Sequence, residues 1–235
     1  MVEKSETEFD LFVIGGGSGG LAASKEAAVL GAKVGLADYV VPTPLGTKWG
    51  LGGTCVNVGC IPKKLMHFAG LSYEGLEDFE KLGYPEKIEK KHNWEIMVKS
   101  IQQYIKKLNF GYKAELRSKE VKYYNCFATL VDPNTISLKD DKGKIELVKA
   151  KYILIATGGR PNYLDVPGSK ECCITSDDVF SLKKSPGKTL VVGASYIALE
   201  CGGFLNALGY ETHVMVRSIL LRGFDQDMAT RIGDY

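Results

Sequence analysis

The sequence predicts an α/β fold, with a parallel sheet, helices and an antiparallel meander, followed by an incomplete second unit of the same kind. Two observations predict it. A short apolar strand, a glycine-rich turn and a helix of small residues follow one another near the N-terminus, and the same order recurs after residue 189. Between these regions, segments of alternating polarity separated by turn residues predict antiparallel strands.

The local pattern gives each element an expected range. The first unit is expected to contain strands over 10–14 and 33–37, helices over 21–30, 63–82 and 94–118, alternating strands over 121–131, 135–140 and 144–150, and an apolar strand over 151–159. The second unit is expected to contain strands over 189–192 and 211–217 with a helix between them, and a further helix at the C-terminal end. The Gly/Pro/Thr-rich segment 39–54 is expected to be a long loop, and such loops are often functional.

Composition excludes several classes of function. The 235 residues are 45% hydrophobic with a net charge of +2, which gives no strong field for nucleic acid or an acidic membrane. No apolar run has the length of a membrane span, and the polar N-terminus does not look like a signal peptide. A cytoplasmic protein is expected, with the mitochondrion as an alternative. No histidine stands at metal-ligand spacing, so no metal site is predicted.

The first glycine-rich turn has the pattern GxGxxG between a strand and a helix, formed by Gly15, Gly17 and Gly20. Such a turn brings the backbone close to a pyrophosphate at a helix N-terminus, where Ser18 and Gly19 would donate. Asp38 lies 23 residues after Gly15, where a carboxylate can accept hydrogen bonds from ribose hydroxyls. The pattern predicts a Rossmann-like dinucleotide site without naming the dinucleotide; the alternative is a structural turn with an exposed aspartate.

A second, weaker copy of this turn follows the strand over 189–192. It reads Gly193, Ala194, Ser195, Tyr196, Ile197 and Ala198, with serine in place of the middle glycine. Arg217 stands 24 residues after Gly193, where the first unit has Asp38. A cation there suits a 2′-phosphate and indicates NADPH, with Arg222 as a second phosphate contact. The alternative is an ordinary surface arginine.

Cys55 and Cys60 form the one suggestive cysteine pair among the six cysteines. A regular helix would separate them by roughly 7.5 Å along its axis, so a distorted turn is expected, which Gly59 permits. Pro62 suits a first helical turn, and Cys60 would then stand near a helix N-terminus beside Lys63, where the thiolate is favoured. The pair indicates redox catalysis; the alternative is two buried structural cysteines. Cys126 and Cys201 are expected to be small buried apolar residues.

The segments GGTCVNVGCIPKK, VIGGGSGG, ATGGRP, VVGASYIALE and VRSILLRGFD together resemble the high-molecular-weight thioredoxin reductases and thioredoxin-glutathione reductases, which are pyridine nucleotide-disulfide oxidoreductases. The resemblance spans nearly the whole chain. It implies FAD on the first unit and NADPH on the second. Electrons would pass from NADPH through FAD to a Cys55–Cys60 disulfide, and then to thioredoxin.

The resemblance also implies roles for single residues. Cys60 would face the flavin and Cys55 would attack the next disulfide, while Lys63 and Glu200 would form an ion pair beside the flavin and Tyr196 would gate it. Further flavin contacts would be Gly53, Thr54, Thr157 and Gly158, and the 2′-phosphate would meet Arg217, Ser218 and Arg222.

The expected organisation is an FAD-binding domain over 1–159 with the redox cysteines, and the N-terminal part of an NADPH-binding domain over 160–235. By resemblance the full-length protein is a homodimer, and the dimerisation domain lies outside this chain. The leading hypothesis is that the protein is an NADPH-dependent thioredoxin-disulfide reductase. Glutathione reductase is one alternative, and a nucleotide-binding fragment that acts through protein contacts is another. Arg217 disfavours an NAD-dependent dihydrolipoamide dehydrogenase.

Overall fold

The computed structural model describes residues 3–76, 78–84 and 91–235. The chain divides into two compact units, each built from two separate stretches. Unit 1 comprises Met1–Cys60 and Gln103–Asp178, and unit 2 comprises Ile61–Gln102 and Val179–Tyr235. The expected domain boundary at 159/160 stays a prediction. Most of the charged segment that follows Pro85 lies outside the described residues.

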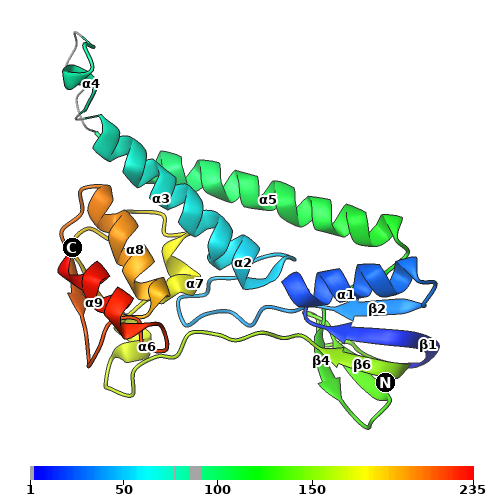
Figure 1. The fold of residues 1–235 in the computed structure, drawn as a ribbon. Helices are drawn as coiled ribbons and strands as arrows, with labels where there is room; N and C mark the ends of the chain where they lie inside the picture. The colour runs from blue at the N-terminus through cyan, green and yellow to red at the C-terminus, as the bar shows by residue number, and fades with distance from the viewer. Residues whose placement is uncertain (1–2, 77, 85–90) are drawn as a thin grey trace. The chain divides into compact units, whose positions relative to one another are not determined.

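Unit 1 is built on one sheet whose strands run in the order β3-β2-β1-β6-β5-β4. Its parallel part consists of β1 (Glu3–Ile14), β2 (Val34–Ala37), β3 (Lys122–Tyr124) and β6 (Ile145–Ile155). Helix α1 (Ser18–Val29) connects β1 to β2 and lies along them (Figure 1). The predicted α/β class with a mostly parallel sheet is confirmed.

The antiparallel part of the sheet differs from the expected meander in two places. β4 (Phe127–Leu130) and β5 (Thr135–Lys139) pair antiparallel with each other, and β5 pairs antiparallel with β6. The segment 121–131, expected as one strand, is two: β3 lies at one edge of the sheet and β4 at the other. The two segments expected on either side of residue 150 are one strand, because β6 pairs with β5 on one side and with β1 on the other.

Two hydrophobic clusters form the core of unit 1. Successive strand residues point to opposite faces of a sheet, and Phe12 and Val13 on β1 accordingly belong to different clusters. Aromatic residues dominate the first cluster, where Phe9 and Phe12 meet edge to face with centroids 5.5 Å apart. The second contains Leu21 of α1 and Leu116 of α5 (Trp94–Ser118). Short helices α6 (Ser169–Cys172) and α7 (Ser176–Val179) follow β6 along the chain.

Unit 2 has its own strand-turn-helix-strand arrangement. It contains most of α3 (Cys60–Gly75), then α4 (Asp78–Lys81), β7 (Thr189–Val192), α8 (Tyr196–Ala207), β8 (Thr212–Met215) and α9 (Gln226–Asp234). β7 and β8 pair in parallel, as the repeated pattern predicts. The single helix expected over 63–82 is instead α3 and α4; α3 ends at Gly75, and glycine has a low helix propensity.

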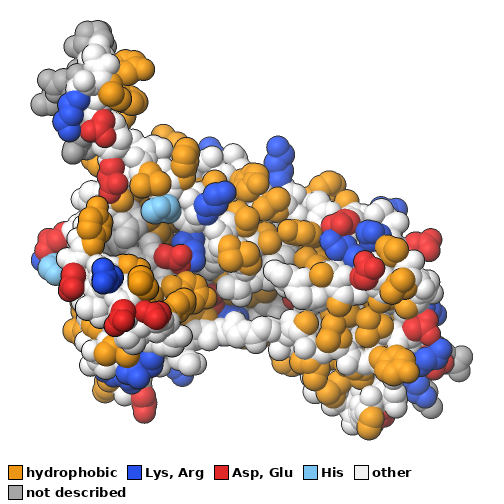
Figure 2. Space-filling model, viewed as in Figure 1, with side chains coloured by type: hydrophobic (Ala, Val, Ile, Leu, Met, Phe, Trp, Pro, Cys, Tyr) orange, Lys and Arg blue, Asp and Glu red, His pale blue; other side chains and the backbone are white. Residues whose placement is uncertain are grey.

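The exposed surface mixes charged and apolar side chains. Figure 2 shows lysine and arginine interspersed with aspartate and glutamate on the visible face, with hydrophobic side chains between them. Within the part of the chain that the structure describes, no helix combines the length and the apolar character needed to cross a membrane.

Candidate nucleotide and redox site

The first glycine-rich turn joins the end of β1 to the start of α1. Gly15 has a φ of +114°, and a Cβ placed on it would lie 2.2 Å from the carbonyl oxygen of Ala156. Its N–H donates to the carbonyl of Ala37 at 2.8 Å, which ties the turn to the end of β2. Only glycine fits a backbone that is both left-handed and this closely packed. The turn is therefore held between the ends of two neighbouring strands.

The N-terminus of α1 is open to a ligand. Ser18 and Gly19 are exposed, and the N-cap residue Gly17 has no side chain to cap the helix. The first turn of α1 carries no acidic side chain. The N–H groups at a helix N-terminus carry partial positive charge, so this end of α1 suits an anion such as a pyrophosphate.

Asp38 closes the turn from the end of β2. Its Oδ1 accepts a hydrogen bond from the N–H of Gly16 at 2.8 Å. Burial raises the pKa of the Asp38 carboxyl, and hydrogen bonds from the backbone of Gly16 and Tyr39 partly offset this effect. The carboxylate predicted to meet a ribose thus also fixes the backbone of the glycine-rich turn.

Thr157 and Gly158 lie directly beyond β6, beside the same turn. The N–H of Ala156 donates to the carbonyl of Ile14 at 2.8 Å, so β1 and β6 end together. Both Thr157 and Gly158 are exposed there. The structure therefore gathers the glycine-rich turn, Asp38 and the Thr157 segment at the carboxyl ends of parallel strands, where α/β proteins bind their ligands.

The cysteine pair lies on two helices that meet at Gly59. Cys55 is half-buried in α2 (Gly53–Val58), and Cys60 is exposed as the first residue of α3. A Cβ on Gly59 would lie 2.9 Å from the carbonyl oxygen of Thr54 and 3.2 Å from the Cα of Cys55. The distortion predicted for this segment is confined to Gly59, where the chain folds back over the residues around Cys55.

The loop before α2 lies directly on the glycine-rich turn. The N–H of Gly52 donates to the carbonyl of Gly16 at 2.9 Å. A Cβ on Gly53 would lie 2.5 Å from the Cα of Gly17, so the two backbones touch without any side chain between them. The helix that carries Cys55 therefore begins directly on the glycine-rich turn.

Sequence reasoning missed a buried carboxylate that anchors the long loop 39–54. Asp178 is 0% exposed, and its Oδ1 accepts hydrogen bonds from the hydroxyls of Thr43 at 2.7 Å and Thr47 at 2.6 Å. Beside it, Arg160 Nε donates to Asp177 Oδ2 at 2.7 Å. Thr43 and Thr47 lie more than 100 residues before Asp178 in the chain, so the local sequence gives no signal for these hydrogen bonds.

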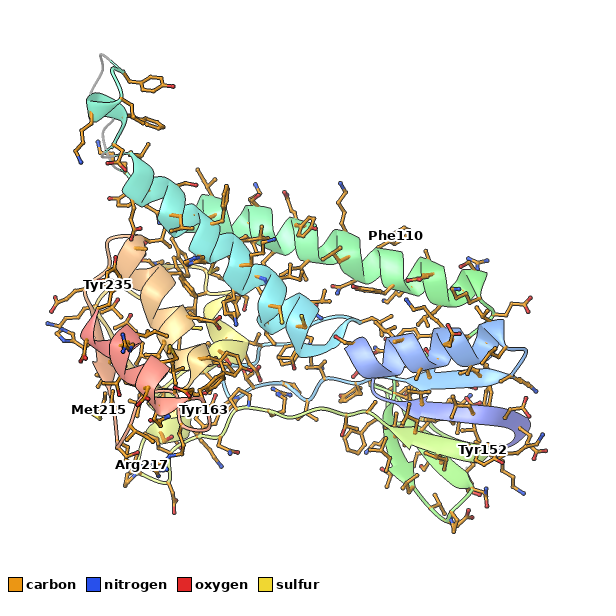
Figure 3. The ribbon with its side chains drawn as sticks, viewed as in Figure 1. Phe110, Tyr152, Tyr163, Met215, Arg217 and Tyr235 are labelled. Atoms are coloured by element: carbon orange, nitrogen blue, oxygen red, sulfur yellow. The ribbon has the colours of Figure 1, made fainter. Side chains whose placement is uncertain are left out.

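A pocket of about 230 Å³ lies next to this anchor. Residues of the loop 39–54 line it together with Arg160 and Tyr163, and Figure 3 labels Tyr163. Burial raises the pKa of Asp177, and the Arg160 guanidinium acts in the opposite direction. The loop 39–54, which is expected to be functional from its composition, is thus anchored to the segment 160–178 of unit 1.

Unit 2 contains the predicted ion pair. Lys63 Nζ contacts the carboxylate of Glu200, and the same ammonium lies 5.3 Å from the ring centroid of Tyr196. Cys201 is buried next to this pair, and burial raises the pKa of its thiol to about 12. The expected buried character of Cys201 is confirmed, whereas Cys126 is only half-buried. Lys63 and Glu200 thus form the ion pair that the resemblance implies, and Tyr196 lies beside it.

The second glycine turn meets the arginine segment that follows β8. The N–H of Gly193 donates to the carbonyl of Met215 at 3.0 Å, and the N–H of Leu221 donates to the carbonyl of Ala194 at 2.8 Å. Arg222 Nη2 donates to Ser218 Oγ at 2.7 Å. Arg217 and Met215 lie at the end of β8 (Figure 3). The residues predicted for the 2′-phosphate therefore belong to one loop beside the second turn.

These features define a class of protein: α/β proteins that carry a cysteine pair beside a dinucleotide-type glycine turn. The family model described as pyridine nucleotide-disulphide oxidoreductase matches residues 9–235. The chain therefore belongs to the pyridine nucleotide-disulphide oxidoreductase family. That membership implies a flavin and a pyridine nucleotide as cofactors.

Similar proteins are named as thioredoxin reductases. The chain is 62% identical over 225 residues to a protein of Emiliania huxleyi named thioredoxin reductase SEP1, covering 96% of this chain and 45% of that protein. It is 57% identical over 238 residues to a thioredoxin reductase of Plasmodium falciparum isolate FCH-5, covering 100% of this chain and 44% of that protein. The chain thus spans less than half the length of these relatives.

Proposed function

We propose that the protein carrying this chain is an NADPH-dependent flavoprotein disulfide reductase that passes electrons through FAD to Cys55 and Cys60 and then to thioredoxin. One observation carries the proposal: the helix that holds Cys55 begins where Gly53 touches Gly17 of the nucleotide-binding turn. A redox pair fixed to a dinucleotide turn is what flavin-to-disulfide transfer requires. The relatives named thioredoxin reductase support the choice of thioredoxin.

Unit 1 has residues that fit FAD. The open N-terminus of α1, with Ser18 and Gly19, would bind the pyrophosphate, and Asp38 would meet the ribose. Bound FAD would supply a two-electron carrier beside the cysteines. Thr54, Thr157 and Gly158 are exposed around the same turn and would complete the contacts.

Unit 2 has residues that fit NADPH. The turn at Gly193 would hold the pyrophosphate, and the Arg217 loop would bind the 2′-phosphate, because two arginines and a serine hydroxyl present charge-assisted donors. NADH has no phosphate at this position. The opposite charges of Asp38 and Arg217 support the binding of different nucleotides at the two similar turns.

Cys55 and Cys60 would divide the thiol-disulfide chemistry. In the reduced protein, the Cys55 thiolate attacks the acceptor disulfide, forming a mixed disulfide and releasing one acceptor thiol. The Cys60 thiolate then attacks the Cys55 sulfur, which closes the Cys55–Cys60 disulfide and releases the second thiol. Two electrons have then passed from the protein to the acceptor. Lys63 would hold positive charge near this pair, oriented by Glu200.

The same thiol-disulfide exchange could also reduce glutathione disulfide. The choice of thioredoxin as the acceptor is therefore itself proposed and needs its own test. We further propose a homodimer that acts in the cytoplasm or mitochondrion. The test is NADPH oxidation by the purified protein with thioredoxin or glutathione disulfide as acceptor. We expect turnover with thioredoxin, a strong preference for NADPH over NADH, and loss of turnover in Cys55→Ser. Cys172→Ser, at another exposed cysteine, is the control.

Turnover with glutathione disulfide alone would replace thioredoxin as the acceptor. Equal rates with NADPH and NADH would contradict the role of Arg217. A Cys55→Ser variant with unchanged turnover would contradict the proposed function as a whole. A protein that binds both nucleotides but reduces neither acceptor would favour the reading as a nucleotide-binding module.

A further inference from the structure

Two asparagine side chains, one buried and one half-buried, bond to each other at the cysteine segment. Asn57 lies on α2 between the two cysteines and is 2% exposed. Its Nδ2 donates to the carbonyl oxygens of Gly50 at 3.0 Å and Gly53 at 2.8 Å. Its Oδ1 accepts from Nδ2 of Asn109, at 2.9 Å. One side chain thus bonds the first turn of its own helix, the loop before it, and α5.

Asn109 completes the arrangement from α5. Its Nδ2 also donates to the carbonyl of Leu51. The loop packs closely around this amide, since a Cβ on Gly50 would lie 2.7 Å from Asn109 Oδ1. Together the two amides bind three backbone carbonyls of the four-residue stretch 50–53, which leads into α2.

Only an amide can occupy position 57 in this arrangement. Two carbonyl oxygens face its nitrogen and one N–H group faces its oxygen, so the side chain must donate twice and accept once. An aspartate has the same shape, but its carboxylate would face the Gly50 and Gly53 oxygens without a proton to share. A buried polar group left in that state costs free energy and moves to find partners.

α2 depends on such anchors. It has six residues, from Gly53 to Val58, and a helix of that length does not persist without tertiary contacts. Its N-terminal end rests on the glycine-rich turn through the contact of Gly53 with Gly17. The amides of Asn57 and Asn109 fix the loop that makes this contact. The position of Cys55 relative to Cys60 therefore depends on both asparagines.

We infer that Asn57 and Asn109 are positioning residues for the Cys55–Cys60 pair: they hold α2 so that the two sulfurs can close into a disulfide. The inference rests on the proposed function, in which these two cysteines form the redox pair. Preorganised reacting groups react with a high effective concentration, which a small displacement lowers. Loss of the amide pair should therefore make the Cys55–Cys60 disulfide less stable.

The test is the equilibrium of the protein with glutathione. The reduced pair and glutathione disulfide give the Cys55–Cys60 disulfide and two glutathione molecules, with two electrons transferred. The protein is equilibrated over a range of glutathione ratios, alkylated, and the disulfide fraction measured by mass spectrometry of the 50–63 region. This measurement needs neither bound flavin, NADPH nor thioredoxin, so it separates positioning from reductase activity.

Asn134→Asp is the control for the change of an amide to a carboxylate, at an exposed residue away from the cysteines. Asn134 also donates from Nδ2 to two backbone carbonyls, those of Ala150 at 2.9 Å and Lys151 at 3.3 Å, but in the antiparallel part of the sheet. We expect the equilibrium constant for disulfide formation to fall about tenfold in Asn57→Asp and to stay at the wild-type value in Asn134→Asp. Asn109→Ala, at a half-buried helix position, should also lower the equilibrium constant for disulfide formation. This second variant keeps the test possible if Asn57→Asp does not fold.

Three results would overturn the inference. Unchanged equilibrium constants in both Asn57→Asp and Asn109→Ala would show that the amides do not position the sulfurs. An equal fall in Asn134→Asp would show a general effect of lost stability. A wild-type protein that forms no Cys55–Cys60 disulfide at any ratio would remove the proposed function as well as the inference.

Discussion

Replacement of Gly15 by alanine tests whether the glycine-rich turn is as tightly built as the structure shows. The new Cβ would lie 2.2 Å from the carbonyl oxygen of Ala156, about 1 Å inside normal contact, and the residue would keep a φ of +114°. The backbone conformation alone costs about 1–3 kcal/mol for a residue other than glycine. Overpacking adds about 1–3 kcal/mol. We expect Gly15→Ala to lose about 2–6 kcal/mol of unfolding free energy and to weaken flavin binding.

Gly19→Ala is the control from the same turn. Nothing lies within 4 Å of a Cβ placed on Gly19, and this residue is part of α1. Alanine there should leave stability unchanged or raise it by about 0.5 kcal/mol, because it has the higher helix propensity. Urea unfolding followed by circular dichroism measures both variants, and flavin absorbance after gel filtration measures binding. A Gly15→Ala protein as stable as Gly19→Ala would refute this reasoning.

Three further predictions concern the buried Asp178 and Cys201 and the half-buried His92. Asp178→Ala should cost about 3 kcal/mol of unfolding free energy, because the hydroxyls that donate to Asp178 lose their buried acceptor. Asp165→Ala, at an exposed site, should leave the unfolding free energy unchanged in the same urea assay. The Cys201 thiol, with a pKa of about 12 against the usual 9.0, should carry roughly 1000-fold less thiolate than an ordinary thiol. Cys201 should therefore stay unalkylated at pH 8 while the exposed Cys172 reacts. Equal labelling of the two, measured by mass spectrometry, would contradict this. Burial lowers the pKa of His92, so unfolding free energy should fall as the pH drops below 6.5, and His92→Gln should remove this dependence in urea titrations.

The two strand-turn-helix-strand stretches of the fold could be predicted because their signals are local. The strand, glycine turn and helix around Gly15 follow directly along the chain, and so do those around Gly193. Among the remaining strands, β3, β4 and β6 were not predicted correctly, for a physical reason. Alternation of polar and apolar residues shows that a segment is a strand, but not which neighbour it pairs with. β3 and β4 therefore looked like one strand, and β6 looked like two.

The residues of the candidate site also fall into those that the sequence predicts and those that it does not. Cys55, Cys60 and Asp38 stand in short motifs whose residue types carry their chemistry. Asn57 lies in the same motif, but its role depends on Asn109, which is 52 residues away on α5. No spacing rule connects two neutral amides at that distance. Asp178 was missed because its hydroxyl partners lie 131 and 135 residues earlier in the chain.

The central claim is that the cysteine pair and the nucleotide-binding turn form one redox centre. The most direct test is the visible spectrum of the purified protein during an anaerobic titration with NADPH. We expect bound flavin whose spectrum gains a long-wavelength band from a Cys60 thiolate next to it, and the absence of that band in Cys60→Ser. A protein that binds no flavin, or one whose spectrum is the same in wild type and Cys60→Ser, would contradict the account.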